Sequence, residues 1–217
     1  MTAMTLGAIF NLTTLLPALI NQFGSLVYVG LFIIIFVETG LVFFPFLPGD
    51  SLLFLSGSIA AIANQGLNVY ALIILLSIAA ILGDSTNFEI GKRFGKYLTT
   101  SEKWMKRINP KHLETARAFF QKHGNSAIFL GRFVPIVRTL VPFVAGGSEM
   151  PYYKFITYNF LGGISWVLVA VLSGYFFGNI PLVNQHFELI MVAIVIVSLL
   201  PVAIVSLNER NKVKKEG

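Results

Sequence analysis

This chain of 217 residues is far more apolar than a soluble protein. Hydrophobic residues make up 55% of it, charged residues 12%, and the mean hydropathy is +0.76. Soluble domains carry about 25% charged residues, so the composition predicts an integral membrane protein. The chain contains no cysteine, which excludes disulfides and thiolate chemistry, and its net charge at pH 7 is +6.

A lead-in helix and a broken apolar segment are predicted for the N-terminal part of the chain. Residues 1–24 predict a short lead-in helix; they contain no Lys or Arg, unlike a signal peptide, so we expect them to be retained. The following apolar segment, 25–63, is broken in its middle by Pro45 and Pro48. Such breaks predict a re-entrant hairpin, although the segment is also long enough for two full spans of about 20 residues each.

The centre of the chain contains a crossing helix and then most of the positive charge. Residues 69–90 are apolar enough to predict the first crossing helix, and 91–124 follow as a basic loop. Nine of the sixteen Lys and Arg residues lie in this loop, and four lie in the C-terminal tail, 208–217. Because loops rich in Lys and Arg stay in the cytoplasm, both regions are expected to be cytoplasmic.

Within the basic loop, residues 101–123 contain the pattern of an amphipathic helix. Apolar Leu113, Ala116 and Phe120 fall on one face, and Lys111, Arg117 and Lys122 are available to the other. A helix of this kind can rest on anionic lipid headgroups. The alternative of an ordinary solvated linker stays open.

The second half repeats the order of a broken segment and a crossing helix. Residues 125–178 predict a hairpin interrupted by Pro135 and Pro142, followed by a crossing helix at 153–177. A full crossing in place of the hairpin would put the basic tail outside, so we expect the hairpin to return to the cytoplasmic side. A last crossing helix at 189–207 then leads to the tail.

Together these segments predict one all-α polytopic membrane domain over 1–217. The two halves, 25–90 and 125–178, share a proline-broken hairpin and a crossing helix that ends in glycines. The hairpins would open to opposite faces, so the halves predict an inverted repeat with two oppositely facing re-entrant hairpins. Broken segments at corresponding positions of such repeats point to a transport site near the membrane midplane.

Four ionisable residues stand inside the two broken segments, namely Glu38, Asp50, Arg132 and Arg138. A charge at bilayer depth costs at least ~2.5 kcal/mol on insertion scales, so these residues must face a polar cavity or one another. They are therefore candidate functional residues. Two structural alternatives stay open: Asp50 could cap the helix that follows it, and the arginines could form a buried ionic clasp with the two acids.

The types of these residues suggest a chemistry. The planar guanidinium group of arginine binds phosphate through two parallel hydrogen bonds and stays charged. A carboxylate at depth can take up and release a proton. The pattern thus predicts a substrate-binding pair, Arg132 and Arg138, and a proton-coupling pair, Glu38 and Asp50.

Two further acids, Asp84 and Glu89, lie near the end of the first crossing helix. We expect them to cap this helix or to pair with Lys92 and Arg93, while Asp84 stays an accessory candidate that could extend a proton path. The chain has only three histidines, none of them in an apolar run. Neither a metal site nor a cofactor is therefore expected.

A set of short motifs extends from Glu38 to Trp166. It comprises Glu38, Phe46-Leu-Pro-Gly-Asp50-Ser, Gly83-Asp84, Gly91-Lys-Arg93-Phe-Gly95, Lys122-His-Gly124, the run from Gly131 to Gly146 with both arginines, Asn159, Gly163 and Trp166. In combination these motifs resemble the bacterial DedA family, also called the SNARE-associated or VTT-domain family, over about residues 25–180. The pair Asn87-Phe88 departs from the pattern, because many members have a tyrosine at this place before the Gly-x-Arg element, and the role of this position is open.

The resemblance implies two oppositely facing hairpins, a plasma-membrane location and a function in lipid translocation. Members of the family are implicated in returning undecaprenyl phosphate across the membrane, some are linked to the proton-motive force, and eukaryotic relatives scramble phospholipids. It implies that Glu38 and Asp50 are the functional acidic pair and that Arg132 and Arg138 are the functional arginine pair.

The favoured hypothesis is a translocase, not an enzyme, for undecaprenyl phosphate or a similar phosphorylated polyprenyl lipid in the bacterial plasma membrane. Alternatives are a proton-coupled transporter of a small solute, a general phospholipid scramblase and a membrane-organising factor. A lipid phosphatase would need a nucleophile with a base, and no histidine lies in an apolar run to act as one.

The expected partners follow from this hypothesis. They are a phosphorylated lipid substrate, protons or another coupling ion, and anionic lipid headgroups at the basic loop. No nucleic-acid partner is expected, and a homo-oligomer is left open.

Overall fold

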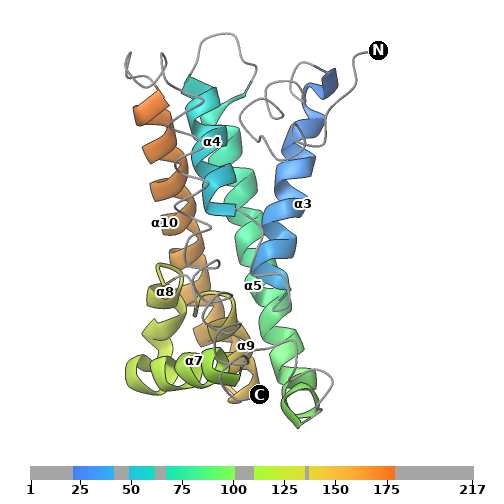
Figure 1. Ribbon diagram of the computed structural model, residues 1–217, viewed down its shortest axis with the longest axis vertical. Coiled ribbons are helices and arrows are strands. Elements are labelled where there is room, and N and C mark those ends of the chain that lie inside the picture. Colours follow the sequence, from blue (N-terminus) through green and yellow to red (C-terminus); the bar gives the residue numbers. More distant parts are fainter. Residues whose placement is uncertain (1–21, 42–48, 62–66, 101–109, 135–136, 179–217) are drawn as a thin grey trace, which may run out of the picture. The chain divides into compact units, whose positions relative to one another are not determined.

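The computed structural model describes residues 22–41, 49–61, 67–100, 110–134 and 137–178, and all regular structure in these ranges is helical (Figure 1). The chain divides into two compact units. Unit 1 comprises Met1–Val27, Pro48–Val69 and Ala170–Gly217, and unit 2 comprises Tyr28–Leu47 and Tyr70–Val169. Most of the predicted lead-in helix, the predicted helix at 189–207 and the tail lie outside the described residues.

Two of the described helices are long and apolar enough to cross a membrane. They are α5 (Val69–Thr100) and α10 (Tyr152–Gly178), with apolar stretches at Val69–Gly95 and Tyr152–Phe177. Each begins within one residue of its predicted start. The sequence therefore located both crossing helices, although α5 continues further into the basic loop than the hydropathy pattern indicated.

The first broken segment contains two shorter apolar helices, α3 (Leu26–Gly40) and α4 (Gly49–Ala61). Helix α3 ends before Pro45, and α4 begins directly after Pro48, in agreement with the breaks expected there. Whether these helices form a re-entrant hairpin or two full spans stays a prediction.

Helix α7 (Pro110–His123) confirms the amphipathic pattern of the basic loop. Proline is favoured at the first helical position because it has no N–H to satisfy there. Gly124, with a φ of +57°, follows the last residue and adopts the left-handed conformation that commonly ends helices. Leu113 and Ala116 are buried, and Figure 1 shows α7 running across the long axes of α5 and α10.

The second broken segment is irregular, as its prolines predict. It contains a single 3₁₀ turn (Gly124–Ser126), the short helix α8 (Ala127–Gly131) and the helix α9 (Leu140–Gly147). Pro142 lies in the first turn of α9, where a proline is tolerated. Arg132 and Arg138 therefore lie between two short helices rather than inside one, and the re-entrant course of the segment stays a prediction.

An apolar core in unit 2 supports this irregular segment. Buried side chains of α7, α8 and α9 pack with Phe88 of α5 and Phe155 of α10. The Phe88 and Phe155 rings are stacked with their centroids 4.3 Å apart. The helices on either side of Arg132 and Arg138 are thus packed against both long helices.

A reciprocal pair of glycines joins α5 to α9 in unit 2. A Cβ atom on Gly91 of α5 would overlap the carbonyl oxygen of Phe143, and one on Gly146 of α9 would overlap the carbonyl oxygen of Phe88. Only glycine permits backbones to approach this closely. Each glycine thus meets the carbonyl group three residues before the partner glycine.

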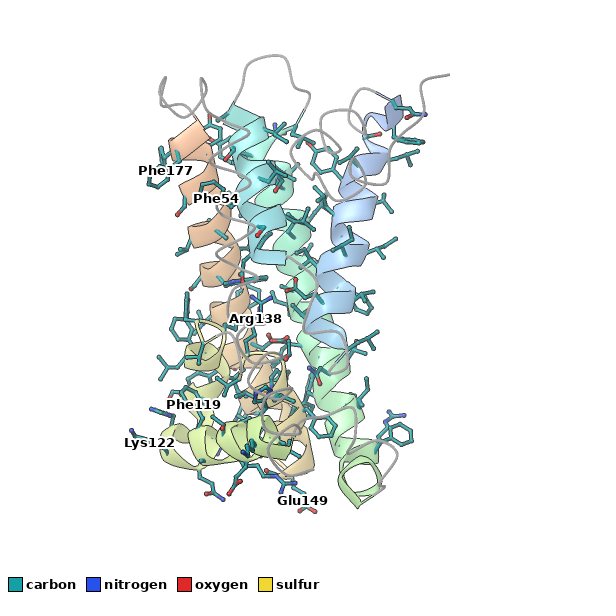
Figure 2. The ribbon with its side chains drawn as sticks, in the orientation of Figure 1. Phe54, Phe119, Lys122, Arg138, Glu149 and Phe177 are labelled. Carbon is teal, nitrogen blue, oxygen red and sulfur yellow. The ribbon has the colours of Figure 1, made fainter. Side chains whose placement is uncertain are left out.

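The same contact recurs in unit 1 between α4 and α10. A Cβ atom on Gly57 would overlap the carbonyl oxygen of Val171, and one on Gly174 would overlap the carbonyl oxygen of Phe54. The offset of three residues is identical. Ser58 also donates a hydrogen bond of 2.9 Å to the carbonyl oxygen of Gly174. Figure 2 shows Phe54 beside Phe177 at this crossing, with ring centroids 6.2 Å apart.

Candidate functional site

Arg138 and Glu38 form an ion pair in unit 2. Nη2 of Arg138 contacts Oε1 of Glu38, which lies in the last turn of α3. The Glu38 side chain is completely buried, whereas the Arg138 side chain is 13% exposed. Arg138, labelled in Figure 2, also lies over the Trp166 ring, with its Cζ 5.1 Å from the centroid. The aromatic face stabilises the cation without neutralising it.

Arg132 is held by a larger set of partners. Its Nη2 lies 2.6 Å from Oδ2 of Asp84, and the two side chains are 5% and 4% exposed. The same nitrogen donates to Oδ1 of Asn159 at 2.6 Å and to the carbonyl oxygen of Ala80 at 3.3 Å. Asn159 is itself fixed, because its Nδ2 donates to the carbonyl oxygen of Ile81 at 3.0 Å. Arg132 is therefore anchored to both α5 and α10.

Small residues make room for these groups. A Cβ atom on Gly162 of α10 would lie 3.1 Å from Cδ of Arg132, and one on Gly163 would lie 2.9 Å from a side-chain carbon of Ile81. A Cβ atom on Gly83 of α5 would overlap the Thr39 hydroxyl of α3. The glycine beside Arg132 leaves a slot for its side chain, and the glycine before Asp84 lets α3 approach α5 closely.

Asn87 joins the two segments that carry the Arg138–Glu38 pair. Its Nδ2 donates to the carbonyl oxygen of Thr39 at 3.1 Å and to the carbonyl oxygen of Thr139 at 2.6 Å. These are the residues directly after Glu38 and Arg138. One buried amide on α5 thus fixes the backbone next to both partners.

Both arginines line one small pocket. The other lining residues are Thr39, Asp84, Thr139 and Trp166. The cavity volume is about 10 Å³, which is room for about one water molecule. The site is therefore closed around its own ion pairs.

Comparison with known proteins identifies the family. The family model described as "VTT domain" matches residues 47–176. "Protein DedA" of Escherichia coli strain K12 is 46% identical over 193 residues, which is 89% of this chain and 88% of DedA. The chain belongs to the VTT-domain (DedA) family.

Other relatives of this VTT-domain protein are named as membrane proteins. "Uncharacterized membrane protein Rv0364" of Mycobacterium tuberculosis is 46% identical over 82% of this chain and 78% of the relative. "Inner membrane protein YghB" of E. coli strain K12 is 37% identical over 84% of this chain and 80% of the relative. No solved structure matches the chain. The protein is thus a bacterial membrane protein, and among the described residues the apolar stretches of α5 and α10 are the candidate membrane spans.

In a membrane this arrangement places two cations and two anions among apolar helices. Burial of isolated charges would cost several kcal/mol each, and pairing offsets much of that cost. The charges of Glu38, Asp84, Arg132 and Arg138 sum to zero. Apolar residues of similar size would fill the same space at a lower cost in free energy. The charged cluster is therefore a candidate functional site.

Three of the four predicted site residues belong to unit 2. Arg132, Arg138 and Glu38 meet in unit 2, as the clasp alternative anticipated in part. Asp84 differs from its expected role, because its ion-pair partner is Arg132 rather than Lys92 or Arg93. The cause is that Arg132, directly after α8, lies against α5, where its Nη2 also donates to the carbonyl oxygen of Ala80. Glu89 does pair with Arg93, at 3.2 Å.

Asp50 belongs to unit 1. It lies exposed in the first turn of α4, the position expected of an N-terminal acid. Among the described residues of unit 1 it is the only one with a charged side chain. Its proposed role in proton coupling therefore stays a prediction.

Three residues that build the site were not assigned roles from the sequence, namely Asn87, Asn159 and Trp166. Both asparagines are fully buried; Asn159 lies in the apolar stretch of α10, whereas Asn87 follows the polar residues 84–86 of α5. A buried amide must find hydrogen-bond partners, so an asparagine within an apolar run is a usable signal. Asn87, whose role was left open, connects Thr39 to Thr139.

Proposed function

We propose that this VTT-domain protein translocates a phosphorylated polyprenyl lipid, such as undecaprenyl phosphate, across the bacterial plasma membrane without chemically changing it. The observation that carries the proposal is that two arginines line one pocket and that each of them pairs with a buried carboxylate. Each guanidinium group now contacts a carboxylate, which is an anionic hydrogen-bond acceptor. A lipid phosphate is an acceptor of the same kind and could take the place of the carboxylate.

In this mechanism the carboxylates are exchangeable counter-ions. An arriving phosphate replaces Glu38 at Arg138, the more exposed of the two arginines. The released carboxylate then lacks a cation in an apolar setting and takes up a proton. Phosphate binding and protonation are thus linked, and thermodynamic linkage is reciprocal.

The size of the pocket sets a condition on transport. Room for about one water molecule cannot accept a phosphate group, so the helices around Arg138 must separate before the headgroup enters. The polyprenyl chain has no place in this pocket and would stay in the surrounding lipid. The described arrangement corresponds to a closed state between loading events.

The proposal includes the inverted repeat with two oppositely facing re-entrant hairpins, and a cytoplasmic basic loop and tail. The matching glycine contacts of α4 with α10 and of α9 with α5 support a repeated architecture. Single cysteines at Ser148, Asn184 and Asn211 of this cysteine-free chain would report topology through an impermeant thiol reagent. Ser148 and Asn211 should label from one side and Asn184 from the other; labelling of Ser148 together with Asn184 would contradict the second hairpin.

The function is tested with purified protein in liposomes that contain a short-chain polyprenyl phosphate. We expect the protein to redistribute the lipid between leaflets, and Glu38→Gln and Asp50→Asn to lose any acceleration by a pH gradient, since amides do not titrate. Equal redistribution of ordinary phospholipids would indicate a general scramblase. No redistribution of either lipid by well-folded protein would contradict the proposal and favour a solute transporter or a membrane-organising factor.

A further inference from the structure

Unit 2 contains a second, larger pocket among α5, α7 and α9. Its cavity volume is about 470 Å³, which is within the range of roughly 300–1,000 Å³ typical of ligand sites. The arginine pocket and this one share no lining residue. This second pocket therefore needs an explanation of its own.

The pocket is lined by both apolar and polar side chains. Leu113, Phe120, Phe143 and Val144 are apolar, whereas Arg117, Gln121 and Ser148 offer hydrogen-bond donors. Gly95 and Gly147 complete the lining. A wall of this kind suits an amphiphile that has an anionic group and a hydrocarbon chain.

The charge of α7 favours an anion. Arg117 is exposed and makes no ion pair within the part of the chain that the structure describes. Lys111 and Lys122 are exposed on the same helix, and Figure 2 shows Lys122 at one end of it. The nearby acids Glu114 and Glu149 do not line the pocket. An anionic headgroup would thus meet a cation, Arg117, for which the described residues provide no counter-ion.

We propose that this pocket binds one molecule of an anionic glycerophospholipid. Its phosphate would accept hydrogen bonds from Arg117, Gln121 and Ser148, and one acyl chain would lie along Phe120, Phe143 and Val144. The inference rests on the protein's membrane location and on α7, not on the proposed translocation. A lipid bound here would hold α7 against α9, the helix that begins two residues after Arg138.

Native mass spectrometry of the protein in a neutral detergent tests the site. The probes are phosphatidylglycerol and phosphatidylcholine with identical acyl chains, added in equal amounts. The variant is Arg117→Gln, which removes the cation that lines the pocket. The matched control is Lys122→Gln, which removes an equally exposed cation of the same helix that does not line it.

We expect wild-type protein to retain one phosphatidylglycerol in preference to phosphatidylcholine, and Arg117→Gln to weaken that retention by on the order of tenfold, the loss expected of a charge-assisted hydrogen bond. Lys122→Gln should leave it nearly unchanged. Equal losses in the two variants would overturn the site in favour of diffuse attraction. No preference between the lipids in wild-type protein would also overturn it. Because binding is measured without transport, failure of the translocation proposal would leave this result unaffected.

Discussion

The two units have the same helix crossing but differ in chemistry. Each joins a short helix after a proline break to a long crossing helix through two glycines, with the same offset of three residues. In unit 2 the crossing of α9 with α5 is accompanied by four charged residues of the arginine cluster, of which Glu38, Asp84 and Arg132 are buried and Arg138 is partly buried. In unit 1 the crossing of α4 with α10 is accompanied, among the described residues, by Asp50 alone, and Asp50 is exposed.

The comparison distinguishes the residues that hold the helices together from the charged residues that are available to bind a ligand. Close backbone contacts through glycine suffice to hold apolar helices together in a membrane. The ion pairs of unit 2 are not repeated in the described part of unit 1, so this crossing does not require them. We infer that the charges serve the ligand rather than the helix contact.

The largest effect on stability is expected from breaking the Arg132–Asp84 pair. Arg132→Met or Asp84→Leu leaves one buried charge without its partner and should lower the free energy of unfolding by ~3–5 kcal/mol. The double variant should recover much of this loss, because it leaves no charge behind. Thermal unfolding in detergent measures both.

The matched control is the acid of the other unit. Asp50→Leu removes an exposed side chain and should cost less than about 1 kcal/mol. Equal losses for Asp84→Leu and Asp50→Leu would remove the distinction between the two units.

Next in size is the effect of filling the glycine crossings. Gly91→Ala in unit 2 and Gly57→Ala in unit 1 each force a methyl group against a backbone carbonyl and should cost roughly 1–3 kcal/mol. Gly95→Ala is the control, because its Cβ would meet only Cα of Gly147, at 3.6 Å. If Gly95→Ala destabilises as much as the other two, helix flexibility and not contact explains the loss.

Substitution of Asn87 should have an effect on stability of similar size. Asn87→Leu removes the donor shared by Thr39 and Thr139 and leaves two buried carbonyl groups without this donor, at a cost of ~1–3 kcal/mol. Phosphate-lipid affinity should fall as well, because the backbone beside Glu38 and Arg138 is no longer fixed. An affinity equal to that of wild-type protein would limit Asn87 to a structural role.

The smallest effect tests a further difference between the two crossings. Ser58 donates to the carbonyl oxygen of Gly174 in unit 1, and the equivalent residue in unit 2 is Gly147, whose Cβ would lie 3.5 Å from the carbonyl oxygen of Gly91. Gly147→Ser should therefore add a hydrogen bond and stabilise the protein by about 0.5–1.5 kcal/mol. A loss of stability would show that the two crossings are not equivalent.

Sequence patterns were sufficient for features that depend on neighbours along the chain. The apolar runs located α5 and α10, the prolines located the breaks around α4 and α9, and the 3.6-residue period located α7. The residue types of Arg132, Arg138 and Glu38 marked them as candidates, because a charge in an apolar run is costly wherever it lies.

Contacts between helices that are distant in the sequence could not be predicted from these patterns. Asp84 has two cations further along its own helix, Lys92 and Arg93, and only the tertiary contact between α5 and the end of α8 gives it Arg132 as a partner. The sequence likewise does not show which helix each glycine contacts. Composition marked Gly91 and Gly174 as the ends of crossing helices but not as partners of Gly146 and Gly57.

The central claim is that the guanidinium group of Arg138 exchanges its carboxylate for a lipid phosphate. The direct measurement compares the affinity of wild-type protein and Arg138→Lys for a polyprenyl phosphate and for the same polyprenyl alcohol. Wild-type protein should bind the phosphate more tightly than the alcohol, and the lysine variant should lose most of that preference, because an ammonium group cannot supply two parallel donors to one phosphate. Equal affinity of wild-type protein for the two lipids, or a preference unchanged in Arg138→Lys, would contradict the claim.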